Sequence, residues 1–247
     1  MKEQIDSNNI PKHIAVIMDG NGRWAQKKGA MRIFGHRNAI AAVRDLIEGT
    51  AELGVEYVSL YAFSTENWSR PEEEINALME LLVEAIVDEV PTMMKNNIRL
   101  VTVGDLSTLP EKCQSHLSWG KEETKNNTGL TVVLAISYSG RWEIVTAVKD
   151  IVKKVIAGDI KPEEIDQGVI ADHLNTAGIP DPELLIRTSG EQRISNFMLW
   201  QLAYAELYFT EVLWPDFRKH DLHEAILAYQ QRERRFGLTG AQIKSQS

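Results

Sequence analysis

The sequence predicts an α/β protein built on a parallel sheet, and two patterns support this fold class. Short apolar runs of strand length alternate with longer segments in which apolar residues recur at helical spacing. The short runs are nearly continuous in apolar character, as expected for strands that are covered on both faces. No repeat, low-complexity linker or domain boundary interrupts residues 1–247. We therefore expect a single domain of right-handed βαβ units, with flexible tails at residues 1–11 and 238–247.

Six segments are expected to be strands, and most are rich in β-branched or aromatic residues. They are His13–Met18, Tyr57–Phe63, Ile98–Val103, Leu130–Ile136, Leu184–Arg187 and a weaker candidate at Glu211–Leu213. Helical periodicity is found in Ala39–Leu53, Pro71–Glu89, Trp142–Ile156 and Asp221–Arg235. The clearest helix start is at Pro71, which is followed by three glutamates.

The composition indicates a protein of a reducing compartment. Its one cysteine, Cys113, excludes an internal disulfide framework. The amino-terminal residues contain no apolar signal core, and no apolar run reaches the roughly 18 residues of a membrane span. We therefore expect a cytoplasmic protein without an integral membrane segment.

The charge is unevenly distributed. The net charge of −8 argues against a dedicated nucleic-acid binder. Between Asp19 and Arg44, however, Asp19 is the only acid, and the local net charge is +5. The basic residues of this stretch are Arg23, Lys27, Lys28, Arg32, Arg37 and Arg44. The stretch forms either a positive pocket for a small anion or a solvated helix face.

Polar chemistry follows three of the expected strands. The first strand runs into Asp19–Arg23, the second into Ser64–Arg70 and the fifth into Arg187–Ser195. Because ligands of open parallel sheets bind beyond the carboxyl ends of the strands, we expect these three segments to meet at one edge.

The first of these segments favours a site for a metal and an oxyanion. Asp19 offers a hard oxygen ligand for Mg²⁺, and the Gly-Asn-Gly sequence that follows offers free amides for phosphate oxygens. Arg23 adds a bidentate oxyanion donor. The loop is neither a Walker A sequence nor a dinucleotide fingerprint. The alternative is a tight turn with a capping aspartate.

Further donors are expected nearby. Arg32 and His36 are four residues apart, so on a helix they share a face, and both can donate to a diphosphate. Arg187, Arg193 and Ser195 surround a glycine turn and suit a second phosphate group. The alternatives are a structural histidine and an ordinary loop with surface arginines.

Two apolar segments complete the prediction. At helical spacing within Phe197–Tyr208, Glu206 lies with apolar residues, so its carboxylate needs a metal or an arginine as partner, unless that helix side is half exposed. The apolar surface of Pro71–Glu89 is wider than a one-sided stripe. That helix is either buried on two sides or lines an apolar tunnel, and a tunnel beside two anion pockets suits a diphosphate with a hydrocarbon tail.

Several long signatures in order make the chain similar to a known family. They are HIAVIMDGNGRWA, Gly35-His36, YAFSTENWSRP, LLIRTSGEQRISNFMLWQLAYAELYFT and WPDF, within residues from about Lys12 to Phe236. With these signatures the chain resembles the undecaprenyl diphosphate synthases, which are bacterial cis-prenyltransferases. The chain lacks the Asp-Asp-x-x-Asp pattern of the trans-prenyltransferases.

The resemblance implies a central, mostly parallel six-stranded sheet flanked by helices, an apolar tunnel and a homodimer. It implies Mg²⁺-dependent, consecutive cis condensations of isopentenyl diphosphate onto farnesyl diphosphate. The product would be a long-chain polyprenyl diphosphate, undecaprenyl diphosphate, the lipid carrier precursor for cell-wall synthesis. It would be released to the membrane, and the cytoplasmic protein would be peripheral to the inner membrane surface.

The resemblance also implies roles for individual residues. Asp19 and Glu206 match the metal positions, and Asp19 and Asn67 match the catalytic positions. The match to the allylic pocket covers Gly20, Asn21, Gly22, Arg23, Trp24, Arg32 and His36. The substrate-contact motif covers Ser64, Thr65, Glu66, Trp68 and Arg70, and the isopentenyl diphosphate pocket covers Arg187, Arg193, Ile194 and Ser195. Because a neutral amide is a poor base, we expect Asn67 to position a water or a diphosphate oxygen that takes the proton.

Three alternatives remain open from the sequence. A related cis-prenyltransferase with a shorter product would have the same catalytic residues and a different tunnel volume. A non-catalytic partner subunit would lack site residues, whereas Asp19, Arg23, Asn67, Arg187 and Arg193 are all present. A Mg²⁺-dependent phosphohydrolase would need neither two arginine pockets nor a broad apolar helix.

Overall fold

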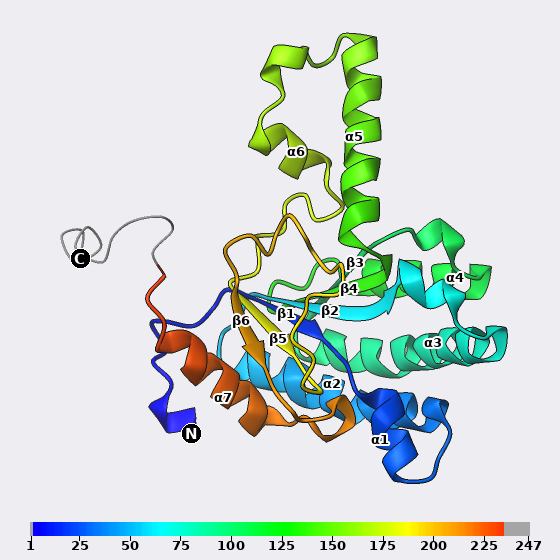
Figure 1. Ribbon diagram of the computed structural model, residues 1–247, viewed down its shortest axis with the longest axis vertical. Helices are drawn as coiled ribbons and strands as arrows, with labels where there is room; N and C mark the ends of the chain where they lie inside the picture. The colour runs from blue at the N-terminus through cyan, green and yellow to red at the C-terminus, as the bar shows by residue number, and fades with distance from the viewer. Residues whose placement is uncertain (1, 235–247) are drawn as a thin grey trace.

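An all-parallel, six-stranded sheet forms the centre of the molecule in the computed structural model, which describes residues 2–234 (Figure 1). The strand order is β3-β4-β2-β1-β5-β6, and every neighbouring pair is parallel. The strands are β1 His13–Ile17, β2 Tyr57–Ser64, β3 Arg99–Val103, β4 Thr131–Tyr138, β5 Leu184–Arg187 and β6 Glu206–Phe209. The predicted fold class is thus confirmed.

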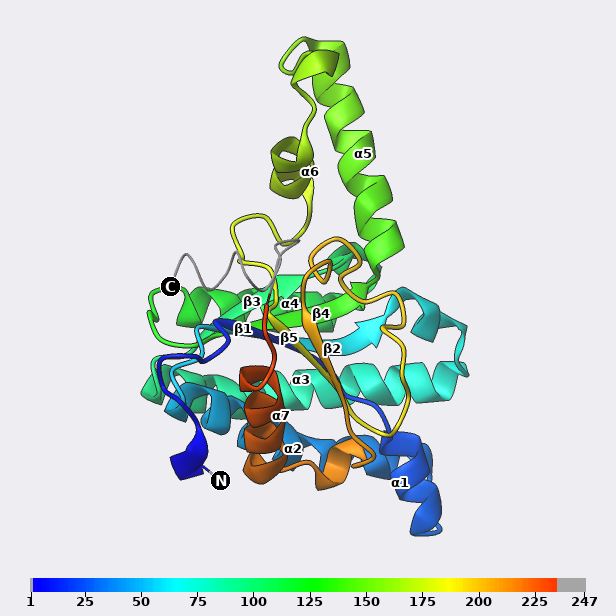
Figure 2. The same ribbon diagram turned by 60° about the vertical axis from the view of Figure 1, so that its left-hand side comes forward.

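Helices cover the sheet unequally. They are α1 Asn21–Lys27, α2 Arg32–Glu52, α3 Glu72–Lys95, α4 Glu111–Thr124, α5 Gly140–Ala157, α6 Gln167–His173 and α7 Lys219–Gln230. Helices α2, α3 and α7 lie together below the sheet, whereas α5 and α6 project away from it on the other side (Figures 1 and 2). Among residues 2–234, none of the helices combines the length and apolar character needed to cross a bilayer.

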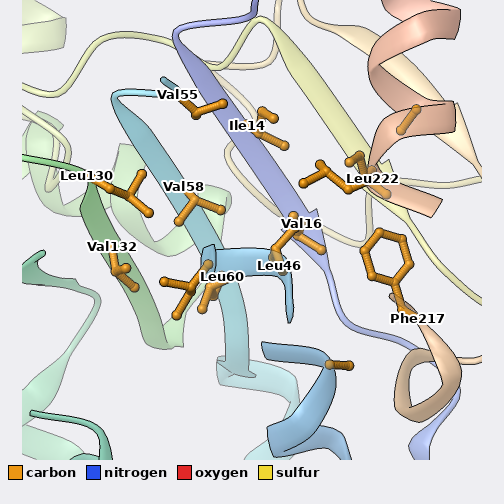
Figure 3. Packing of buried hydrophobic residues seen from close by; sticks show 14 of the residues in the cluster. Ile14, Val16, Leu46, Val55, Val58, Leu60, Leu130, Val132, Phe217 and Leu222 are labelled. Carbon is orange, nitrogen blue, oxygen red and sulfur yellow. The ribbon is translucent and has the colours of Figure 1, made fainter. Parts of the chain in front are cut away.

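The core forms because alternate residues of each strand face opposite sides of the sheet. Ile14 and Val16 of β1 pack with Leu46 of α2 and Leu222 of α7 (Figure 3). Ala15 and Ile17 face the other side, where the irregular segment 194–202 supplies apolar side chains in place of a helix. All five β1 residues are buried, which explains the continuous apolar run in the sequence.

Several predicted boundaries are wrong, among them the end of α3, which lies at Lys95 and not at Glu89. The sixth strand is Glu206–Phe209 and not Glu211–Leu213, and the residues before it form turns and not a helix. Helix α2 begins seven residues before the predicted Ala39 and contains Gly35, where α1 approaches closely. A Cβ at Gly35 would lie 2.0 Å from the carbonyl oxygen of Asn21. Helix α7 ends at Gln230 and not at Arg235.

The amino-terminal residues are also held more firmly than predicted. The backbone N–H of Asp6 donates to the Gln230 side chain over 3.1 Å, and the same side chain donates to the carbonyls of Asp6 and Asn9. Asp6 and Asn9 are therefore tied to α7 within the segment that was predicted to be a tail. The predicted tail at residues 238–247 lies outside the described residues.

Stability should depend on the protonation of His13, at the start of β1. Burial lowers its pKa to about 4, although the Pro180 carbonyl and the charge of Glu183 act in the opposite direction. The unfolded chain takes up this proton near pH 6.5 and the folded chain only near pH 4. We therefore expect the free energy of unfolding to fall by about 2–3 kcal/mol between these values.

Denaturant titrations at several pH values check this expectation. The variant His13→Gln keeps a polar side chain beside Ser59, whose hydroxyl lies 2.7 Å from the imidazole Nε2, but it cannot titrate. Its unfolding free energy should depend less steeply on pH between 6.5 and 4. Equal slopes for the two chains would contradict the assignment.

Candidate functional site

A cavity of about 450 Å³ opens at the carboxyl ends of β1, β2 and β5. Its mouth is polar, and the predicted site residues that line it are Asp19, Asn21, His36, Ser64, Asn67, Arg70, Arg187 and Ser195. The three strand ends singled out in the sequence therefore meet around one mouth.

The interior of the cavity is apolar and runs between α2, α3 and the sheet. Its walls include Ile40, Val43 and Ile47 from α2, and Leu78, Leu82, Ala85, Ile86, Val90 and Met93 from α3. Helix α3 also packs against α4, with Val83 in the same buried cluster as Leu117. The wide apolar surface of α3 thus has two uses, because one side lines the cavity and another is buried in the core.

Asp19 is placed by the end of β1. Its Oδ2 accepts from the guanidinium of Arg187 at 2.9 Å, and its Oδ1 accepts from the backbone N–H of Gly20 at 2.7 Å. Partial burial raises the pKa of Asp19, but the hydrogen bond and charge of Arg187 and the Gly20 amide outweigh it, so the pKa is lowered. Asp19 is therefore a carboxylate at neutral pH.

The two glycines of this loop have steric reasons to be glycine. Gly20 has a φ of +107°, and a Cβ there would lie 2.9 Å from the side chain of Leu213. A Cβ at Gly22 would lie 3.1 Å from the guanidinium carbon of Arg32. Gly20 therefore turns the chain into α1, and Gly22 leaves space for an arginine; neither lines the cavity.

Arg187 links Asp19 to the loop after β5. Its side chain is 4% exposed and donates to the Arg193 carbonyl at 2.5 Å and to the Ser195 hydroxyl at 2.6 Å, besides Asp19. This loop is strained, since the non-glycine residues Ser195 and Asn196 have φ values of 47° and 60°. A buried arginine thus holds Ser195 at the cavity mouth.

Three further predicted arginines surround the mouth without lining the cavity. Arg23 donates to the Ser189 carbonyl at 3.0 Å and lies 3.5 Å from Asp19. Arg193 pairs with Glu191, and Arg32 lies 3.4 Å from Glu74. The side chains of Arg32 and Arg193 are each more than half exposed. They can therefore turn toward an anion without disturbing the core.

The segment after β2 ties the two sides of the mouth together. Thr65 donates to Ser139 at 2.8 Å, and Glu66 accepts from the Asn196 amide at 2.7 Å. Thr65 thus faces the turn between β4 and α5, Glu66 faces the loop after β5, and neither lines the cavity. Ser64 and Asn67 do line the cavity, and the Asn67 Oδ1 accepts from the Ser64 backbone N–H at 3.1 Å.

Comparison with known proteins places the chain in a family. Residues 17–237 match the prenyltransferase family model described as "Putative undecaprenyl diphosphate synthase". The chain belongs to this family. It is 54% identical to an isoprenyl transferase of Porphyromonas gingivalis, over 95% of this chain and 92% of that protein.

Two further comparisons agree. The ditrans,polycis-undecaprenyl-diphosphate synthase of Vibrio cholerae, named as specific for (2E,6E)-farnesyl diphosphate, is 52% identical over 96% of this chain and 94% of its own. The crystal structure of lavandulyl diphosphate synthase from Lavandula x intermedia, in complex with dimethylallyl diphosphate, superposes with a TM-score of 0.91 at 36% identity. It covers 93% of this chain and 99% of its own. The predicted family and fold are thus confirmed.

Three predicted residues have packing contacts in this member of the undecaprenyl diphosphate synthase family. The Trp24 indole is buried and donates to Asp216 at 2.7 Å, and the Trp68 indole donates to Ser137 at 3.0 Å. Ile194 packs against the core cluster on the α5 side of the sheet. None of the three lines the cavity, so we expect any effect on substrate to act through the loops that they support.

His36 lies at the mouth as a neutral ring. Burial lowers its pKa to about 4, and the charge of Arg70 adds to this effect. The Asn21 amide lies 3.3 Å from the His36 Nδ1, which leaves Nε2 to carry the proton of the neutral ring. His36 can therefore donate a hydrogen bond to an anion but does not add a positive charge at pH 7.

The predicted metal position Glu206 lies away from Asp19 within the chain. Glu206 is paired in register with Leu184, whereas Arg187 lies three residues further along β5, a distance of about 10 Å. Its carboxylate accepts from Arg232 at 2.9 Å. The expected helical setting is wrong, because Glu206 begins β6; of the two expected partners the structure shows an arginine, and the metal role of Glu206 stays a prediction.

Glu74 is a site residue that the sequence reasoning missed. Its half-buried carboxylate lies 3.2 Å from Arg70 and 3.4 Å from Arg32, so it orients two cations of the mouth. The spacing of Arg70 and Glu74, four residues apart at a helix start, was the available signal. Deeper in the cavity wall, Glu89 accepts from Arg44 at 2.7 Å and joins α3 to α2.

The donor set at the mouth suits Mg²⁺ held jointly with a diphosphate. Among the described residues, no three His, Cys, Asp or Glu side chains gather into a metal cluster. Mg²⁺ often binds through only one or two carboxylates together with phosphate oxygens and water. Asp19 supplies such a carboxylate, and the buried Oδ1 of Asn21 lacks a hydrogen-bond donor. The buried Nε of Arg187 likewise lacks an acceptor, which a phosphate oxygen would supply.

Asn67 has two separable functions that mutation can distinguish. Its Oδ1 caps the turn at Ser64, and the side chain also lines the cavity. Asn67→Asp keeps the capping oxygen but replaces the NH₂ donor with a charged oxygen. We expect it to lower kcat by about 10²-fold with little change in thermal stability.

Asn67→Ala provides the comparison, because it removes the cap as well. It should lower kcat similarly and also reduce the free energy of unfolding by about 1 kcal/mol. Steady-state kinetics and thermal melts measure both effects. Near-normal turnover of Asn67→Asp would show that only the cap matters.

Proposed function

We propose that the protein condenses isopentenyl diphosphate repeatedly onto farnesyl diphosphate in the cis configuration, with Mg²⁺. The product is a long-chain polyprenyl diphosphate, undecaprenyl diphosphate, the carrier-lipid precursor for cell-wall synthesis. The observation that carries the proposal is one continuous cavity with two groups of anion-binding donors at its mouth and an apolar interior. The names of the bacterial relatives agree with it.

The two substrates would divide the mouth between them. Asn21, His36 and Arg70 lie beside the apolar interior and suit the allylic diphosphate, whose hydrocarbon tail would enter between α2 and α3. Arg187 and Ser195, on the β5 side, suit the diphosphate of isopentenyl diphosphate. This arrangement brings the isopentenyl double bond toward the allylic carbon.

The residues then assist the transfer in different ways. As the allylic C–O bond breaks, negative charge grows on the departing diphosphate, where Arg23, Arg32 and Arg70 can reach it. Asp19 would hold Mg²⁺, which when bound would supply further positive charge to that diphosphate. The isopentenyl double bond forms the new C–C bond, and one proton leaves. Asn67 would position the water or diphosphate oxygen that accepts this proton.

One assay separates this reaction from the alternatives. The protein is incubated with farnesyl diphosphate and labelled isopentenyl diphosphate, with Mg²⁺ or with EDTA, and the products are sized. We expect elongated polyprenyl diphosphates only with Mg²⁺. Phosphate release without elongation would indicate a phosphohydrolase, and no reaction would indicate a non-catalytic subunit; either result would reject the proposal.

Filling the cavity should shorten the product. Ala85 lines the interior wall, so Ala85→Phe would occupy space that the growing chain needs. Val87, on the outer side of the same helix, is 43% exposed. We expect product sizing to show shorter chains for Ala85→Phe and wild-type lengths for Val87→Phe. Equal lengths in both variants would place the growing chain elsewhere.

A homodimer and a cytoplasmic location also belong to the proposal. The outer side of α5 exposes Val145, Val148, Val152 and Ile156, which are 49–82% exposed and spaced as one helix stripe. Such a stripe is typical of a helix that packs against another one. Sedimentation should give twice the 27.9 kDa mass of the chain; a monomer at working concentrations would reject the dimer.

A further inference from the structure

The turn between α1 and α2 exposes apolar and basic side chains together. Met31 is 78% exposed and Phe34 is 44% exposed. Lys27, Lys28 and Arg37 are exposed beside them. We call these five residues the elbow surface. The proposed reaction makes no use of these exposed apolar side chains.

The elbow surface carries uncompensated positive charge. The sequence has no acidic residue from Gly20 to Arg44, although the whole chain has a net charge of −8. Within residues 2–234, Lys27, Lys28 and Arg37 form no ion pair. The Lys28 ammonium lies over the Trp24 ring, 4.4 Å from its centroid, and Trp24 also stacks with Phe34. Because none of the three cations is paired with a carboxylate of the described residues, and an aromatic ring does not neutralise the Lys28 ammonium, their positive charge remains available to an anionic partner.

The elbow surface is also adjacent to the cavity mouth. Asn21 begins α1 and His36 lies in the second turn of α2, and both line the mouth. The elbow surface lies on the residues that connect them. Both views place α1 at the end of the molecule opposite the projecting α5 and α6 (Figures 1 and 2).

We propose that the elbow surface docks onto an anionic lipid bilayer. Met31 and Phe34 enter the boundary between headgroups and acyl chains, and the three cations contact anionic headgroups. The inference rests on the proposed function, because a product with a long hydrocarbon chain has to pass from the cavity into a bilayer. An acidic protein partner would be attracted by the same charge but would not need an apolar contact next to the cavity mouth.

Vesicle binding by the full chain, without substrates, tests the docking. We expect binding to vesicles of phosphatidylcholine with phosphatidylglycerol, much weaker binding to phosphatidylcholine alone, and weakening by salt. Each cation near the surface contributes about fivefold to affinity. Lys27→Glu/Lys28→Glu should therefore lower the affinity at least about tenfold, and Met31→Ser should lower it several-fold.

A matched variant controls for net charge. Lys95→Glu/Lys112→Glu makes the same change on exposed residues of α3 and α4 and should bind vesicles within about twofold of wild type. In detergent solution, all three variants should elongate isopentenyl diphosphate as the wild type does. That assay separates failure of the docking from failure of the proposed reaction.

Two results would overturn the proposal. Wild-type protein that does not bind anionic vesicles would point to an acidic protein surface as the partner. Equal losses for Lys27→Glu/Lys28→Glu and Lys95→Glu/Lys112→Glu would show that attraction depends on net charge and not on the elbow surface.

Discussion

Replacing Asp19 by asparagine should lower kcat by about 10²–10³-fold while the protein stays folded. Asparagine removes the negative charge that is suited to bind Mg²⁺ but keeps an oxygen acceptor for Arg187 or the Gly20 amide. Alanine is a harsher change, because it leaves the guanidinium of Arg187 buried without its carboxylate. We expect Asp19→Ala to cost several kcal/mol of stability in addition.

Steady-state kinetics and thermal melts of both variants measure these effects. Asp45→Asn is a suitable control, since Asp45 pairs with Arg218 at 3.8 Å and does not line the cavity. It should retain wild-type turnover. Undiminished turnover of a folded Asp19→Asn protein would refute the role given to this carboxylate.

Replacing Arg187 by lysine should lower kcat/KM for isopentenyl diphosphate by about 10²-fold. Lysine keeps the charge, but its single ammonium cannot reproduce the planar fork that contacts Asp19, the Arg193 carbonyl and Ser195 together. The strained loop then loses an anchor, so we expect the free energy of unfolding to fall by about 1–3 kcal/mol.

Because the proposal assigns the two substrates to different sides of the cavity mouth, this second prediction distinguishes between them. The KM for isopentenyl diphosphate should rise more than the KM for farnesyl diphosphate, when each is measured at saturation of the other. The exposed Arg141→Lys on α5 serves as the control and should leave both constants unchanged. A larger rise for farnesyl diphosphate would reverse our assignment of the two substrates.

Buried strands were the most predictable part of the fold. The continuous apolar runs of β1, β4 and β5 reflect strands covered on both faces, so their positions could be predicted from residue type alone. β6 lies at the edge of the sheet and is only partly buried, so it lacks this signal. The prediction therefore placed the sixth strand too late in the chain. It also gave helical spacing to the residues that form this strand and the turns before it.

The candidate site was predictable where it depends on strand ends and not where it depends on loops. Asp19, Ser64 and Arg187 meet because parallel strands bring their carboxyl ends to one edge. The loop after β5 instead depends on left-handed backbone at Ser195 and Asn196, which residue type does not reveal. The helical setting expected for Glu206 was wrong because Glu206 begins the partly buried edge strand β6.

Mass and double-bond geometry of the elongation products test the central claim most directly. Wild-type protein is given farnesyl diphosphate, carbon-13-labelled isopentenyl diphosphate and Mg²⁺, and the products are analysed by mass spectrometry and NMR. The account predicts masses that increase by successive isopentenyl units, with every new double bond cis. New trans double bonds, or an unextended farnesyl chain, would contradict it.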